Sequence, residues 1–238
     1  MIAITSDIDW APDPVIRFMV EMLEEHEIKC TFFCTHTSEI IEEIIKKPLF
    51  EVALHPNFNG LMDRTEQGTA AEIIEELKNK FPSAKGIRSH SLTMSSRLLQ
   101  MFKGLDFAYE SNYLVPYQFS HQPWKCWTGI TRIPIHWEDD IEFTINGKVT
   151  QFQPPPAKER FCIYNFHPIH VFLHTRNASH YENAKIHYQD AEALEKEREL
   201  TEYNIHSFFR DLLGQMKSSG ECGITLSEIS DIIQNEKG

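Results

Sequence analysis

The feature that most constrains the fold of this chain is the repeated alternation of short apolar runs with amphipathic helical segments. The apolar runs are rich in β-branched and aromatic residues, as buried strands are, and apolar residues recur every three or four positions between them. Parallel strands need such crossover segments, so the pattern favours a largely parallel sheet or barrel. We predict strands directly after the first methionine and at residues 29–34, 50–54, 86–88, 107–109, 130–137 and 161–166.

Five of these predicted strands end in residues that carry chemistry. Ligand sites in parallel α/β folds lie at the C-terminal ends of the strands, so polar side chains there share one pocket. One such ending would mean little, but five together indicate a common site. The endings are Asp7 with Asp9, His55-Pro56-Asn57-Phe58-Asn59, Arg88-Ser89-His90, His136-Trp137-Glu138-Asp139-Asp140 and His167-Pro168.

Local signals define the segments between the strands. Asp13-Pro14 predicts a helix with Asp13 as its N-cap. Asn146-Gly147 favours a type I′ turn, so we expect a small hairpin insertion between the last two strands. No Gly/Ser/Pro-rich linker divides the sequence, and residues 1–238 are therefore expected to form a single domain.

The net charge and the cysteine content limit the classes of binding partner and the cellular compartment that we expect. The 35 acidic and 23 basic side chains give a formal net charge of −12, which repels nucleic acid and anionic lipid surfaces. The five cysteines form no Cys-x-x-Cys pair, which fits a reducing compartment. No stretch reaches the roughly 18 apolar residues of a membrane helix, and a strand directly after the first methionine leaves no room for a secretory signal. We expect a cytoplasmic protein with a small-molecule substrate.

Asp7 and Asp9 are the most informative pair of residues. They bring two carboxylates to the mouth of the sheet, where burial is costly unless something compensates, and a bound metal ion is the usual compensation. The alternative is a turn and helix-cap pair, which turn chemistry favours about two to one for an isolated Asp-x-Asp. The other strand endings favour the metal.

The five endings, in this order, resemble the motifs of the polysaccharide deacetylase superfamily (NodB homology, carbohydrate esterase family 4). The resemblance is strongest to its cytoplasmic branch, which is linked to O-antigen sugar biosynthesis. It implies a distorted (β/α) barrel of about seven parallel strands and a metal-dependent enzyme that removes an N-acyl group, expected to be N-acetyl, from a sugar. The resembling segments are residues 6–13, 54–59, 86–92 and 164–170.

The resemblance also implies roles for individual residues. Asp7 corresponds to the general base and Asp9 to a metal ligand. Ile8 separates two acids that are adjacent in the family, so the exchanged assignment stays open. Arg88 corresponds to the arginine that orients the base through charge-assisted hydrogen bonds. His167 corresponds to the general acid, with a pKa close to the working pH.

His55 and Asn59 complete the metal site that the resemblance implies. The family has a second histidine where this chain has Asn59, and an amide oxygen is a weaker donor for zinc than imidazole. His90 from the next loop is the alternative donor. We expect zinc, with manganese, iron or cobalt as alternatives.

Other residues at the strand ends are expected to contact the sugar. We expect His170 either to be one of these residues or to be an ordinary polar residue. A helix that began early enough would align His170 with His167, but Pro168 opposes such a helix. The expected substrate-binding residues are Trp10, Asn57, His90, Trp137, Asp139 and His170.

Three functional hypotheses follow from the sequence. The first is a metal-dependent N-deacylase acting on a sugar, nucleotide-linked or lipid-linked, during surface-polysaccharide biosynthesis. The second is a hydrolase of the same fold that cleaves another C–N bond, such as a cyclic amide or ureide. The third is a non-catalytic binding protein, which is motivated by Asn59 in the place of a histidine.

Overall fold

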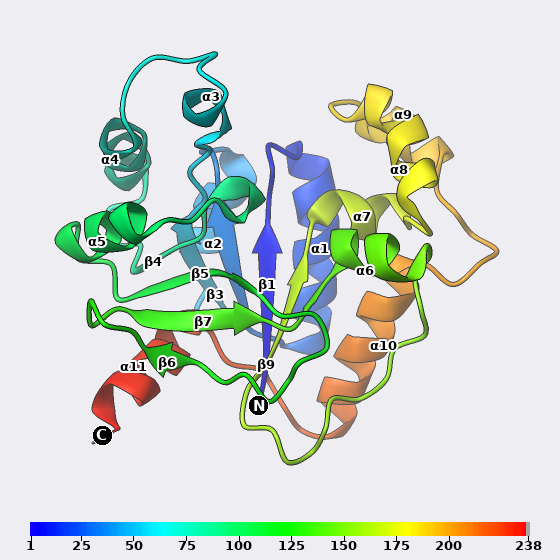
Figure 1. The fold of residues 1–238 in the computed structure, drawn as a ribbon. Helices are drawn as coiled ribbons and strands as arrows, with labels where there is room; N and C mark the ends of the chain where they lie inside the picture. The colour runs from blue at the N-terminus through cyan, green and yellow to red at the C-terminus, as the bar shows by residue number, and fades with distance from the viewer. Residues whose placement is uncertain (237–238) are drawn as a thin grey trace.

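The computed structural model describes residues 1–236, and a nine-stranded sheet forms its centre (Figure 1). The strand order is β6-β7-β5-β4-β3-β2-β1-β9-β8, and every neighbouring pair is parallel except β6 with β7. The predicted parallel α/β architecture is therefore confirmed. The strands are β1 (Ile2–Asp7), β2 (Cys30–Cys34), β3 (Phe50–Leu54), β4 (Gly86–Ile87), β5 (Tyr109–Leu114), β6 (Trp124–Lys125), β7 (Thr131–Ile135), β8 (Trp137–Glu138) and β9 (Cys162–Phe166).

The helices cover the sheet and extend beyond the ends of its strands (Figure 1). Several begin with side-chain caps, and those at Thr69 and Thr225 are complete capping boxes; the hydroxyl and backbone N–H of Thr69, for example, both pair with Glu72. The helices are α1 (Asp13–His26), α2 (Glu39–Ile45), α3 (Asn59–Met62), α4 (Ala70–Lys80), η1 (His90–Leu92), α5 (Ser96–Gly104), α6 (Asp139–Asn146), α7 (Pro168–Leu173), α8 (Ala178–Ala184), η2 (Lys185–His187), α9 (Ala191–Lys196), α10 (Ile205–Ser218) and α11 (Leu226–Asn235).

Strand β1 lies inside the sheet, between β2 and β9, and is buried on both faces. Successive side chains of a strand point to opposite faces, and accordingly Ile2 and Ile4 belong to the large apolar cluster that includes α1 and α10. Ala3 belongs to a second cluster on the other face, together with Leu226 and Ile229 of α11. Because β1 is held from both sides, the carboxylates at its end have a rigid support.

The predicted strand over residues 130–137 is divided in two by the curl of the sheet. Strand β7 pairs with β5, whereas β8 pairs with β9 at the opposite edge of the strand order. Only His136 separates these two strands, and its backbone N–H donates to the carbonyl of Ile163 in β9 at 2.9 Å. The sheet therefore curls into a half-barrel, and the ends of its strands face one region.

Two local predictions are wrong. The helix α1 has Pro12 as its N-cap, and Asp13, the first helical residue, instead accepts a hydrogen bond from the backbone of Ile40 at 3.3 Å. Asn146-Gly147 does not form a hairpin turn but ends α6, with Gly147 at φ 70° and its N–H bonded to Phe143. A left-handed glycine satisfies a helix C-terminus as well as a type I′ turn, so the sequence pair alone does not distinguish them.

Candidate active site

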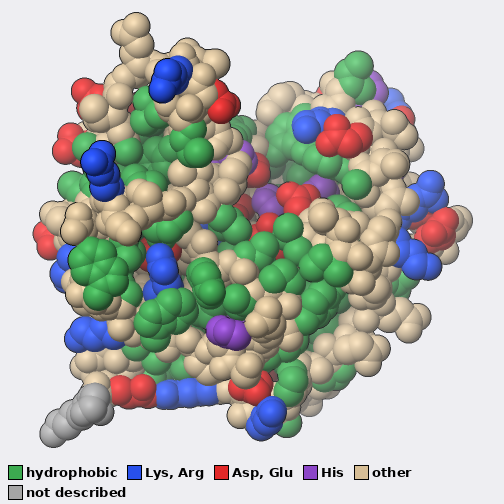
Figure 2. Space-filling view, viewed as in Figure 1, with side chains coloured by type: hydrophobic (Ala, Val, Ile, Leu, Met, Phe, Trp, Pro, Cys, Tyr) green, Lys and Arg blue, Asp and Glu red, His purple; other side chains and the backbone are tan. Residues whose placement is uncertain are grey.

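The ends of β1, β3, β4, β8 and β9 surround a pocket of about 110 Å³. Figure 2 shows the hollow between the region formed by α3 to α5 and the region formed by α8 and α9, with histidine and acidic side chains exposed in it. Strand endings that are far apart in the sequence thus meet as the parallel topology predicts. The pocket is lined by Asp7, Asp9, His55, His90, Ser91, Leu92, Glu138, Asp140 and His167.

Asp7 is buried and held by Arg88. The Nη1 atom of Arg88 donates to Asp7 Oδ1 at 2.7 Å, and the side-chain amide of Asn165 donates to Asp7 Oδ2 at 3.1 Å. The guanidinium is itself fully buried over the ring of Phe33, and its Nε donates to the carbonyl of Ser111. Burial raises the pKa of Asp7, but Arg88, together with His55 and His167, outweighs burial and holds the pKa below its ordinary value. Asp7 is therefore ionised and able to accept a proton.

Asp9, His55 and His90 form a second group beside Asp7. Asp9 Oδ1 lies 3.1 Å from His55 Nε2 and 3.0 Å from His90 Nδ1. Burial raises the pKa of Asp9, but its hydrogen bonds with the two histidines outweigh burial and hold it well below its ordinary value. The hydrogen bond to Asp9 in turn raises the pKa of His90.

The chemistry of these three donors fits a divalent metal ion. His55 Nδ1 lies 2.8 Å from the carbonyl oxygen of Arg88, which only accepts, so the ring must donate its proton there. In a neutral imidazole, His55 Nε2 then directs a lone pair toward the carboxylate of Asp9. Two acceptors at this distance repel unless a proton or a cation lies between them. The carbonyl that fixes the tautomer is the kind of outer partner that metal-ligating histidines have.

Asn59 lies at the start of α3 and does not line the pocket. Its side-chain nitrogen donates to Ser91 Oγ at 3.1 Å, and its backbone N–H donates to Asn57 Oδ1 at 2.9 Å. The histidine of the next loop, His90, stands in the group with Asp9 instead. Metal ligation by Asn59 stays a prediction.

His167 is held on the opposite side of the pocket by Asp139. Its Nδ1 and its backbone N–H lie 2.7 Å from the two carboxylate oxygens of Asp139, and its Nε2 lies 3.6 Å from Asp9 Oδ2. Burial lowers the pKa of His167, but Asp139 and Asp140 outweigh burial and raise it well above its ordinary value. His167 is therefore protonated, with one N–H directed toward the pocket.

Two further acids belong to this side of the pocket. Asp140, half of whose side chain is exposed, lies 2.7 Å from His170 Nε2. Glu138 is buried, and burial raises its pKa to about 7. The amide of Asn165 that donates to Asp7 also donates to Glu138, at 3.2 Å. Asn165 is not among the predicted site residues. The signal that could have identified it is a polar residue inside the otherwise apolar run of β9.

The remaining predicted substrate-binding residues are spread over different surroundings. Trp10 is 40% exposed and lines, with Asn57, an adjoining cavity of about 230 Å³ that shares His55 with the pocket. Trp137 is not brought to the pocket: it is buried and stacks on Phe208 with ring centroids 4.2 Å apart.

Comparison with known proteins agrees with this arrangement. Residues 4–185 match the family model for WbmS-like polysaccharide deacetylases. The chain belongs to this family. It is also similar to the crystal structure of a polysaccharide deacetylase from Bordetella bronchiseptica described as involved in O-antigen biosynthesis, with a TM-score of 0.84 and 31% identity over 90% of each chain. The predicted resemblance is thus confirmed.

More distant structures share the fold of this WbmS-like chain. A polysaccharide deacetylase from Mycobacterium smegmatis has a TM-score of 0.58 at 13% identity, covering 98% of this chain and 89% of its own. A 4-alpha-glucanotransferase from Thermococcus litoralis has a TM-score of 0.52 at 13% identity, covering 97% of this chain and 38% of its own. At such identities the likeness concerns the fold alone. No curated protein matches the chain significantly.

Family membership supports a hydrolase that acts on a C–N bond outside peptides. WbmS-like deacetylases belong to a group that is generally metal-dependent, in keeping with the Asp9, His55 and His90 group. Within residues 1–236, no helix combines the length and the apolar character needed to cross a bilayer.

Proposed function

We propose that this protein is a metal-dependent deacylase that removes an N-acyl group, N-acetyl in the first instance, from a small sugar substrate. The observation that carries the proposal is a single pocket lined by Asp7 paired with Arg88, His167 paired with Asp139, and the donor group of Asp9, His55 and His90. The similarity to the Bordetella protein supports a place in O-antigen biosynthesis. A sugar linked to a nucleotide or a lipid carrier in the cytoplasm suits such a role.

Asp9, His55 and His90 would hold the divalent ion. Two imidazoles and one carboxylate suit zinc, and manganese, iron and cobalt also accept such ligands. When bound, the ion would polarise the amide carbonyl and lower the pKa of water at the site. Asn59 remains a proposed additional oxygen donor, hydrogen-bonded to Ser91 beside the group.

The chain's own residues would supply the proton transfers. Asp7, kept ionised by Arg88, accepts a proton from the attacking water. His167, kept protonated by Asp139, donates a proton to the leaving nitrogen, because an amine leaves poorly unless it is protonated. The products are a free amino sugar and a small carboxylic acid.

The hypothesis of a non-catalytic protein rests on the missing histidine at Asn59. His90 brings an imidazole within 3.0 Å of Asp9, which removes that motive and supports the catalytic proposal. The choice between an N-acyl sugar and another C–N bond depends on pocket contacts with a substrate.

Metal analysis and acetate release test the proposal directly. Protein purified without chelator is expected to contain about one divalent ion per chain and to release acetate from a panel of N-acetylated sugars and sugar nucleotides. Asp9→Ala should lose both the metal and the activity, whereas Asp63→Ala, the same change at an exposed acid after α3, should keep both. Absence of metal, with no hydrolysis after zinc, manganese, iron or cobalt is added, overturns the proposal.

A further inference from the structure

The turn that carries Asp9 has a strained backbone. Asp9 and Trp10 have φ values of 39° and 57°, and the N–H of Ala11 closes the turn by donating to the carbonyl of Ile8 at 2.8 Å. Positive φ at both central residues is a conformation that turns normally reserve for asparagine and glycine. Aspartate tolerates it, but a tryptophan there is disfavoured, because its Cβ crowds the following carbonyl oxygen. Something outside the turn must therefore hold it.

Two side chains from the C-terminal part of the chain contact this turn. The hydroxyl of Tyr188 donates to the carbonyl of Asp9 at 2.6 Å, and the side-chain amide of Gln189 donates to the carbonyl of Trp10 at 3.0 Å. Each donor lies 179 positions from its acceptor in the sequence. The carbonyls of the consecutive residues Asp9 and Trp10 are thus held by the consecutive residues Tyr188 and Gln189.

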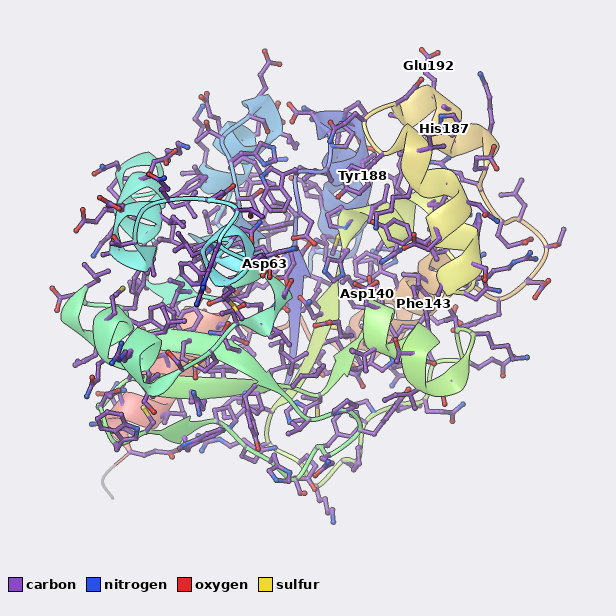
Figure 3. The ribbon with its side chains drawn as sticks, turned by 45° about the horizontal axis from the view of Figure 1, so that its top comes forward. Asp63, Asp140, Phe143, His187, Tyr188 and Glu192 are labelled. Atoms are coloured by element: carbon purple, nitrogen blue, oxygen red, sulfur yellow. The ribbon has the colours of Figure 1, made fainter. Side chains whose placement is uncertain are left out.

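Tyr188 is suited to this contact by its surroundings. Figure 3 shows it on the inner edge of the segment that connects η2 with α9, whereas His187 and Glu192 lie farther out. Its ring packs against the large apolar cluster. Burial raises the pKa of Tyr188 well above its ordinary value, so the hydroxyl keeps the proton that it donates.

The turn determines where the metal-binding group points. The carboxylate of Asp9 projects from it toward His55 and His90, and the ring of Trp10 meets the ring of His90 edge-on with centroids 5.2 Å apart. If the turn relaxed to an ordinary conformation, both the carboxylate and this aromatic contact would move. Outer partners of metal ligands typically contribute a factor of about 10–100 in metal affinity.

We propose that Tyr188 and Gln189 form a clamp that positions the Asp9–Trp10 turn for metal binding. They are positioning residues, because they act through the backbone of Asp9 and not on the substrate. The clamp makes metal binding depend on the folded segment between α8 and α9, which lies outside the five strand endings. This inference rests on the proposed metal site.

Metal affinity of the Tyr188→Phe variant tests the clamp. We expect zinc, measured by competition with a chromophoric chelator, to bind about tenfold more weakly than to the parent protein. The visible spectrum of the cobalt-loaded variant should also change, because the position of the Asp9 carboxylate changes. Gln189→Leu should act in the same direction with a smaller effect, since its hydrogen bond is longer.

Tyr203→Phe is the matched control. It also removes one tyrosine hydroxyl, here one that bonds Phe152 and Asp211 away from the pocket. A melting-temperature measurement on the metal-free proteins controls for folding. Unchanged zinc affinity in Tyr188→Phe, or an equal loss in Tyr203→Phe, overturns the clamp. A parent protein that binds no zinc would instead overturn the proposed function.

Discussion

The two sides of the pocket hold their buried carboxylates in opposite ways. Asp7, at the end of β1, pairs with the guanidinium of Arg88, and its pKa lies below the ordinary value. Glu138, in β8, forms no salt bridge with any lysine, arginine or histidine of residues 1–236, and burial raises its pKa to about 7. The same amide nitrogen of Asn165 donates to both carboxylates, at 3.1 and 3.2 Å. The buried guanidinium of Arg88, which pairs with Asp7 and not with Glu138, is therefore the main feature that separates the two pKa values.

In the proposed reaction the two sides of the pocket have opposite tasks. The β1 side keeps a carboxylate ionised, and the β8 side keeps the imidazolium of His167 charged through Asp139. Pairs of titratable groups with oppositely shifted pKa values are typical of acid–base catalysis. Four substitutions test whether the two sides work in this way.

Asp7→Asn is expected to have the largest effect. The amide keeps the shape of the carboxylate but does not accept a proton, so kcat should fall roughly 100-fold to 10,000-fold. Metal content should remain at the parent level, because Asp9, His55 and His90 are untouched. Steady-state kinetics together with metal analysis check this. Loss of metal from Asp7→Asn would mean that Asp7 and Asp9 have exchanged roles.

Asp139→Asn tests the opposite side. The imidazole of His167 loses the carboxylate that keeps it charged and oriented, and kcat should fall about 100-fold. Metal content should again stay at the parent level. If kcat is unchanged, the proton for the leaving nitrogen comes from another group.

Glu138→Gln tests the raised pKa. The pKa of Glu138 is about 7 in the folded protein, against 4.5 for an ordinary glutamate. Between these pH values the folded protein therefore binds this proton more tightly than the unfolded chain does. The free energy of unfolding therefore falls as pH rises from 4.5 to 7. At pH 8 the variant should be more stable than the parent by roughly 1–3 kcal/mol, with little difference at pH 4. Urea denaturation of chelator-treated protein measures this; an equal effect at both pH values would contradict it.

Asp140→Asn should have the smallest effect. Its pair with His170 has the same length as the pair of Asp139 with His167, but half of the Asp140 side chain is exposed and solvent screens the interaction. We expect kcat to fall about threefold. A loss as large as that of Asp139→Asn would show that Asp140 acts directly in the reaction.

The fold and most of the pocket were predictable from local patterns. Strand runs that end in acids, histidines or arginine lead to one edge of a parallel sheet, so Asp7, Asp9, His55 and His167 meet as expected. The prediction of a hairpin at Asn146-Gly147 is wrong because Gly147 satisfies a helix C-terminus equally well. Trp137 is a predicted pocket residue, but its aromatic ring packs in the core against Phe208.

The sequence by itself determined the parallel architecture, the family and which side chains reach the mouth of the sheet. These follow from hydrophobic periodicity and from residue types at strand ends, which are local properties. Only the tertiary structure decided that His90 joins Asp9 and His55, that Asn165 bridges Asp7 and Glu138, and that Tyr188 holds the Asp9 turn. Ligand grouping, protonation and turn strain depend on contacts between residues far apart in the chain, which no local pattern records.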